Sequence, residues 1–220
     1  MNKVIYSRIV ILAIFLLYST TYAEDDSQKM KDFFRSCEEG VIVKIKAMID
    51  EGISANALNS DGDTALMIAT MSEQEEAVKV LIEKGADVNA KNNKARTALM
   101  EAAWMGNLSL VKFFIEKGAD VNAKGNVGDT ALMKAVRKGN NEIIKLLIEK
   151  GADINAKTDW GRTSLFYAVL KGDIDITKLL LSKKADVTIK TKDGWTALKW
   201  AELQGRKEIV DLLKEAGAKE

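Results

Sequence analysis

Apolar residues return in two short clusters along most of the chain, and the clusters keep a constant distance from one another. Within residues 129–157 the first cluster centres on Leu132 and Ala135, and the second extends from Ile143 to Ile148. Apolar residues three or four positions apart lie on one face of a helix. Each cluster therefore predicts a short helix, and the polar residues between them, which include Gly139, predict a tight turn.

This helix pair is predicted to occur again and again, because its marker residues repeat at a fixed interval. The markers are threonines spaced 33 residues apart: Thr64, Thr97, Thr130, Thr163 and Thr196. Self-similarity at a period of this length indicates a solenoid, in which each unit covers the apolar band of its neighbour. Thr130 is predicted to cap the first helix of its unit, and Gly139 to end that helix in a left-handed conformation.

The repeating pattern predicts one domain, since it runs from Met30 to the end without a linker rich in proline or serine. A polar spacer at residues 24–29 precedes it. We place the units at residues 30–60, 61–93, 94–126, 127–159, 160–192 and 193–220. The first unit has Lys31 in place of the threonine, and the last surrounds its apolar residues with polar ones. Both are predicted to be caps of the array.

The amino terminus has the pattern of a secretory signal peptide. Lys3 and Arg8 supply positive charge, an apolar run follows at residues 9–18, and Thr21 and Ala23 place small residues before a cleavage point at Glu24. We expect residues 1–23 to be removed and the protein to be exported from a bacterial cell, into the periplasm or beyond. The alternative is an uncleaved anchor, but the apolar run is short for a bilayer. We expect no stable membrane insertion after cleavage.

Composition removes several classes of function. The chain has no histidine, the commonest general base and metal ligand, and a single cysteine, which cannot form an intrachain disulfide or a cysteine-based zinc site. Its 33 basic and 32 acidic residues give no electrostatic argument for nucleic acid. We expect no catalytic residue, metal, cofactor, small-molecule substrate or nucleic-acid partner. The lone thiol, Cys37, is predicted to be buried and inert, with pairing to another chain as the alternative.

Two loops have a weak likeness to ligand-binding motifs, and both are better explained as turns of the repeat. Residues 59–63 carry oxygen ligands suited to calcium, but Thr70 stands where an EF-hand requires a bidentate glutamate. Residues 125–128 are rich in glycine but lack the Lys-Ser/Thr pair of a phosphate-binding loop. A recurring aspartate column indicates folding rather than one catalytic carboxylate pair.

The full units carry the motif Gly-x-Thr-Ala-Leu followed by Ile-Glu-Lys-Gly-Ala-Asp-Val-Asn-Ala-Lys, with local changes. Over residues 30–220 the chain thereby resembles the ankyrin repeat proteins, although it lacks the proline and the histidine usual in their motif. The resemblance implies an all-α solenoid of about six stacked helix-turn-helix units with short β-hairpin-like turns. It also implies a non-enzymatic module that binds a protein partner on a concave face made by the turn tips and first helices. We expect a monomer.

Some positions depart from the repeat and predict weak places in it. Glu73 and Lys184 stand in glycine columns, where a left-handed conformation would cost each of them about 1 kcal/mol. Thr188 replaces the asparagine of the loop column. The joint between units 160–192 and 193–220 is therefore predicted to be a weak seam.

Columns that vary from unit to unit are free to serve recognition. All four tryptophans fall in such columns, and Trp, Tyr and Arg are common interface anchors. The candidate protein-binding residues are Trp104, Met105, Arg137, Lys138, Trp160, Arg162, Tyr167, Leu170, Trp195 and Trp200. Trp160 and Trp195 are predicted to lie at turn tips. For Trp200 and Trp104 the alternative is packing within the stack.

Two other functions remain open from the sequence. The first is a secreted effector that acts on a host-cell protein, and the place where the mature protein resides distinguishes it from a periplasmic binding module. A hydrolase with an unrecognised carboxylate site is a third hypothesis, and it requires a converging carboxylate pair specific to one unit.

Overall fold

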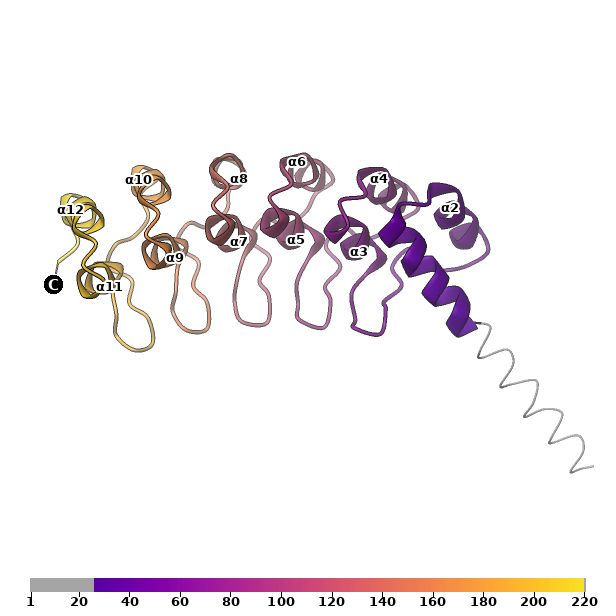
Figure 1. Ribbon diagram of the computed structural model, residues 1–220, viewed down its shortest axis with the longest axis horizontal. Coiled ribbons are helices and arrows are strands. Elements are labelled where there is room, and N and C mark those ends of the chain that lie inside the picture. Colours follow the sequence, from indigo (N-terminus) through magenta and orange to yellow (C-terminus); the bar gives the residue numbers. More distant parts are fainter. Residues whose placement is uncertain (1–25, 220) are drawn as a thin grey trace, which may run out of the picture.

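The computed structural model describes residues 26–219, which form a gently arched row of helix pairs (Figure 1). The first helices of the units are α3 (Ala65–Met71), α5 (Ala98–Met105), α7 (Ala131–Lys138), α9 (Ser164–Lys171) and α11 (Ala197–Leu203). The second helices are α2 (Ile42–Asp50), α4 (Glu75–Glu83), α6 (Leu108–Glu116), α8 (Asn141–Glu149), α10 (Ile174–Ser182) and α12 (Lys207–Glu215). The loops that connect one unit to the next, called tip loops here, extend from the side of the array on which the first helices lie (Figure 1).

The predicted all-α solenoid is confirmed. Between residues 26 and 219 the backbone forms helices and turns without a named strand, and an isolated antiparallel bridge joins Leu58 to Thr64 at one tip. No helix in this range combines the length and apolar character that a bilayer span needs. The predicted signal peptide, residues 1–23, lies outside the described residues, and the unit boundaries drawn above stay predictions.

Each first helix begins where the sequence predicts, because a threonine caps it. The hydroxyl oxygen of Thr130 accepts a hydrogen bond from the backbone N–H of Met133, at 3.4 Å. The other four marker threonines make the equivalent bond. Such a cap satisfies a backbone donor that the helix itself leaves unpaired. Gly139 ends α7 with φ 93°, so the predicted left-handed end is also confirmed.

The core lies between the two rows of helices and runs the length of the array. Ala135 and its counterparts in the other full units are completely buried on the first helices, where a small side chain allows close helix approach. On α8, Ile143, Ile144 and Leu147 are completely buried, while Leu146 and Ile148 pack against the core from its edge. The apolar band is therefore covered by the neighbouring units, as a solenoid requires.

Asparagine side chains join neighbouring units through the loops that follow the second helices. The side-chain oxygen of Asn122 accepts from the backbone N–H of Asp153 at 2.7 Å, and its amide donates to the carbonyl of Gly151 at 3.0 Å. Asn89 makes the same pair of bonds one unit earlier, and Asn56 does so two units earlier. This asparagine ladder ties each unit to the next one.

Backbone hydrogen bonds also connect the tip loops. The N–H of Asn126 donates to the carbonyl of Lys94 at 3.0 Å, and the next two joints repeat this bond 33 residues apart. At the first joint the bond comes instead from a side chain, the amide of Asn93, which donates to the carbonyl of Asp61. The tips thus form a continuous strip along one edge of the array.

The two weak motif loops are turns of this strip. The side-chain oxygen of Asn59 accepts from the backbone N–H groups of Asp61 and Asp63, both at 2.9 Å, so it organises the turn. The equivalent turn two units later, at residues 125–129, is closed by a bond of 2.9 Å from the backbone N–H of Gly125 to the carbonyl of Asp129. The interpretation as repeat turns agrees with these bonds.

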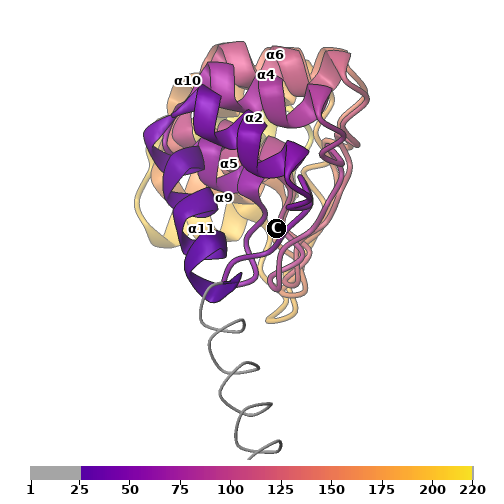
Figure 2. The same cartoon turned by 90° about the vertical axis from the view of Figure 1, so that its right-hand side faces the viewer.

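The first unit differs from the others at its amino-terminal helix. This helix covers residues 26–39, is called the cap helix here, and runs obliquely toward the level of the tips (Figures 1 and 2). It includes residues 26–29, which we expected to be a polar spacer. Phe33 and Cys37 on this helix are completely buried, and burial raises the pKa of the Cys37 thiol to about 12. A buried and unreactive thiol is thus the interpretation that the structure favours for Cys37.

Candidate protein-interaction face

The first helices and tip loops of the three units covering residues 94–192 enclose an open hollow of about 650 Å³, called the central cleft here. Helix α5 supplies one wall, α9 the opposite wall and α7 the floor, while two tip loops form the rim. The lining residues are Trp104, Val127, Asp129, Lys134, Arg137, Trp160, Arg162, Tyr167, Leu170 and Lys171. It lies on the side of the first helices and tips, where the family resemblance predicts a binding surface.

Arg137 stands at the centre of the cleft, between two aromatic rings. Its guanidinium carbon lies 5.2 Å from the ring centre of Trp104 and 5.5 Å from that of Tyr167. Trp104 and Arg137 occupy the same column of successive units, so stacking of the units brings the ring and the guanidinium together. Attraction between a cation and the face of an aromatic ring stabilises this arrangement.

Two ion pairs support the concave face from below. Lys134 and Asp129 are joined at 2.6 Å, with 13% and 10% of their side chains exposed. Arg96 contacts Glu101 at 2.9 Å, and Glu101 is buried. Burial raises the pKa of the Glu101 carboxyl, while the nearby Arg96 acts in the opposite direction. Of the two pairs, the one between Lys134 and Asp129 lies in the lining of the cleft, and removal of either partner would leave a largely buried charge without compensation.

Large apolar groups around the cleft remain open to solvent. Trp160 is 49% exposed, Trp104 is 40% exposed and Val127 is 38% exposed. Single exposed apolar residues are common on any protein, but three of them around one hollow make that hollow a candidate interaction site.

The structure brings together most, but not all, of the candidate residues. Those that line the central cleft are Trp104, Arg137, Trp160, Arg162, Tyr167 and Leu170. Met105 and Lys138, at the ends of α5 and α7, are outside it. Trp195 and Trp200 form a separate group, in which their ring centres are 5.8 Å apart and Trp200 also meets Phe166 at 5.9 Å.

Trp200 packs within the stack of helices, which was the alternative to a binding role for this residue. It is half-buried against the hydrophobic core, and its buried indole N–H has no hydrogen-bond partner among the described residues. Trp104, for which the same alternative was open, instead stands at the wall of the cleft. The difference arises because Trp200 has aromatic neighbours on two sides, whereas Trp104 faces the cationic side chains of α7.

Lys134 and Lys171 line the cleft although they are absent from the candidate set. Lys134 occupies the same repeat column as Tyr167 and Trp200. Because those two were candidates, the column could have predicted that Lys134 also lies on the concave face. Lys171 stands at the end of α9, in the column of Lys138. Its ammonium group donates to the carbonyl of Lys138 at 3.3 Å, which holds it across the gap between α7 and α9.

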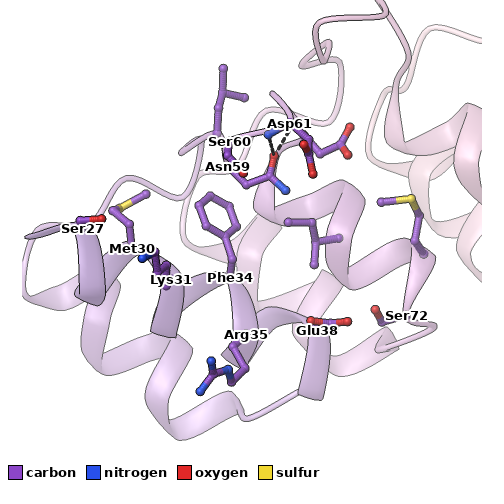
Figure 3. Close-up of a pocket in the computed structure, with 14 residues that line it drawn as sticks. Ser27, Met30, Lys31, Phe34, Arg35, Glu38, Asn59, Ser60, Asp61 and Ser72 are labelled. Atoms are coloured by element: carbon purple, nitrogen blue, oxygen red, sulfur yellow. Dashed lines mark hydrogen bonds between the residues drawn. The ribbon is translucent and has the colours of Figure 1, made fainter.

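A second hollow, of about 790 Å³, lies between the cap helix and the first tip loop (Figure 3). Phe34 points from the cap helix toward Asn59, and Met30, Ile68 and Met71 add apolar surface. Its charged groups are of both signs, and it contains none of the candidate residues. It also adjoins residue 26, where the described part of the chain begins. The central cleft is therefore the stronger candidate.

The architecture defines a class of protein, a repeat solenoid with an open concave face. The family model for "Ankyrin repeats (3 copies)" matches residues 33–125, 99–191 and 132–220, which together cover most of the chain. The chain belongs to the ankyrin repeat family, and ankyrin repeats are protein–protein interaction modules that in general have no enzymatic activity. A comparison with curated proteins gave no match.

Proposed function

We propose that this chain is a non-enzymatic binding module that acts outside the cytoplasm and holds a protein partner in its central cleft. The observation that carries the proposal is the group of Trp104, Arg137, Trp160 and Tyr167 on three successive units. Aromatic and arginine side chains dominate the binding energy of protein interfaces when they cluster at the centre of a patch.

The arrangement of fixed and variable positions supports this function. The capping threonines, buried alanines and ladder asparagines repeat because every unit needs them to fold. The cleft residues differ from unit to unit, and Trp104, Arg137 and Trp160 make no capping or ladder bond and are not part of the buried core. A surface that is exposed, rich in anchor residues and dispensable for the fold is suited to recognition.

Export is the second part of the proposal, and it is supported by the basic, apolar and small-residue segments of residues 1–23. Periplasmic residence is the form we favour. Release into the medium or into a host cell would instead favour the effector hypothesis, which uses the same cleft on a different partner.

The binding role is tested by removing the two exposed indoles. The double variant Trp104→Ala with Trp160→Ala is expected to lose capture of the protein partner from the compartment where the protein resides. Its helical circular dichroism and melting temperature should remain near those of the unaltered protein, because both rings are substantially exposed.

The matched control is Val43→Ala on α2, an apolar residue that is more exposed still and far from the cleft. It should capture the partner normally. Normal capture by the double variant would refute the proposal. If the double variant loses its helical signal, the single variant Trp160→Ala decides, since its ring lies on a tip loop outside the helices.

A further inference from the structure

We infer that the partner segment held in the central cleft is acidic: an extended stretch of a protein chain in which carboxylate side chains alternate with apolar ones. This inference rests on the proposed function of the cleft and adds the chemistry of the partner.

The cleft has an excess of positive charge. Four cationic side chains, Lys134, Arg137, Arg162 and Lys171, line it against a single carboxylate, Asp129. Asp129 is already engaged by Lys134 at 2.6 Å. Lys171 lies 4.0 Å from Asp173, outside the lining, and donates to the carbonyl of Lys138. The charges left for a ligand in the cleft are therefore those of Arg137 and Arg162.

Two of these cations have no acidic partner. Within residues 26–219, no carboxylate lies at ion-pairing distance from Arg137 or Arg162. Arg96 occupies the same column as Arg162 two units earlier, and it does pair, with Glu101. The repeat can thus neutralise an arginine in this column, and it does not do so where the column borders the cleft.

Aromatic rings hold both guanidinium groups in place. Arg137 lies between Trp104 and Tyr167, and Arg162 lies 5.8 Å from the ring centre of Phe166. These contacts place the guanidinium carbons over the aromatic rings. The N–H donors at their edges make no hydrogen bond to the rest of the described chain, and their fork matches the two oxygens of a carboxylate. Because the rings fix the orientation in advance, less side-chain entropy is lost on binding.

The apolar part of the lining argues for a peptide rather than a small anion. Val127, Trp160 and Leu170 lie among the cations. A free anion would leave this surface exposed, whereas a segment with apolar side chains beside its carboxylates would cover it.

A single-stranded nucleic acid also combines negative charge with groups that stack on aromatic rings. The charge pattern of the concave face favours the acidic peptide. The basic surface extends from the cleft to the neighbouring tip residues Lys94 and Arg96, but Asp61 and Asp63 stand at the next tip, so it does not continue as a stripe to the amino-terminal end of the array. A phosphate backbone that followed the tips would meet these carboxylates.

The test measures fluorescence anisotropy of the purified protein with a short labelled peptide in which glutamates and leucines are set among serines. We expect it to bind about tenfold more tightly than the same peptide with glutamine or lysine in place of glutamate. Added salt should weaken binding, since the attraction is screened. Inorganic phosphate and a short oligothymidine should compete poorly.

Variants locate the interaction. Arg137→Gln and Arg162→Gln should each weaken binding by about tenfold, and Arg137→Lys should have an intermediate effect because the charge remains without the planar fork. The matched control is Lys145→Gln on α8, an exposed cation away from the cleft, which should bind as the unaltered protein does.

Equal binding of the glutamate and glutamine peptides would overturn the inference, as would unchanged affinity of Arg137→Gln or stronger competition by oligothymidine. If the glutamate peptide fails to bind while the double tryptophan variant still loses its partner, the proposed function stands and only the acidic partner is wrong. If the double variant keeps its partner, the proposed function itself fails.

Discussion

Single residues that depart from the repeat carry measurable strain. Lys184 has φ 62° and Glu73 has φ 55°, so both take the left-handed conformation that their glycine columns require. The sequence predicts this at both positions, because the register of 33 residues places them beside glycines of known role. Ala95, which also stands in a glycine column, has φ 53°. A side chain in this region costs about 1–2 kcal/mol relative to glycine.

The variant Lys184→Gly is therefore expected to stabilise the protein by about 1 kcal/mol and to raise the melting temperature by about 2–4 °C. Relief of the strained backbone exceeds the added flexibility of glycine in the unfolded chain. Thermal unfolding followed by circular dichroism measures the shift. The neighbouring variant Lys183→Gly is the control, since Lys183 has φ −95° and should gain nothing. An unchanged or lower melting temperature for Lys184→Gly would contradict the assignment.

The roles of the tryptophans could be predicted only in part from their columns. Trp160 and Trp195 both belong to tip columns, yet Trp160 borders the cleft and Trp195 packs edge-on against Trp200. The column of a residue predicts its position on the backbone, but its side-chain contacts depend on the residues of the neighbouring unit. The aromatic neighbour of Trp195 is particular to the last unit, so the period alone could not reveal it.

At the scale of elements, the asparagine ladder weakens toward the carboxy terminus. Asn155 accepts from the backbone N–H of Asp186 at 2.8 Å, but among the described residues its amide donates no bond to the carbonyl of Lys184. Thr188, the next member of the column, bonds only within its own loop, to Asp186. The joint between units 127–159 and 160–192 thus lacks one ladder bond, and at the next joint, the predicted weak seam, Thr188 makes no ladder bond within the described residues.

Substitutions along the ladder should show this difference. Asn122→Ala removes two hydrogen bonds between units and Asn155→Ala removes one, so the first is expected to cost about 1 kcal/mol more in unfolding free energy. Urea unfolding of the two variants gives the comparison. Asn141→Ala, at the exposed start of α8, should have little effect. Equal costs at positions 122 and 155 would show that the ladder is uniform.

For the whole molecule, a nearly neutral total charge conceals a local excess. The balance of 33 basic and 32 acidic residues is spread over all units, while the cleft collects four cations from two neighbouring units. The fold could be predicted almost completely, because period, caps and apolar bands are local properties of the sequence. The charge of the cleft could not be predicted in the same way, since it depends on which side chains neutralise one another across units.

Export also concerns the molecule as a whole. We expect the mature protein, isolated from its native cells, to begin at Glu24, with a mass lower by that of residues 1–23. Amino-terminal sequencing and mass spectrometry measure this directly. Replacement of Ala23 by arginine, which places a large side chain at the cleavage point, should leave the longer form. A mature protein that retains residues 1–23 would favour the anchor instead.

The tip bonds, the ladder and the buried bands all follow one register, so a whole unit can be exchanged without disturbing its neighbours' folding. Loss of residues 127–159 would join residue 126 to residue 160 in register and set α5 against α9. Such a shortened array would keep Trp104 and Tyr167 but would lose the guanidinium between them. Loss or gain of one unit would therefore change the chemistry of the proposed binding cleft in a single step, while the architecture persists.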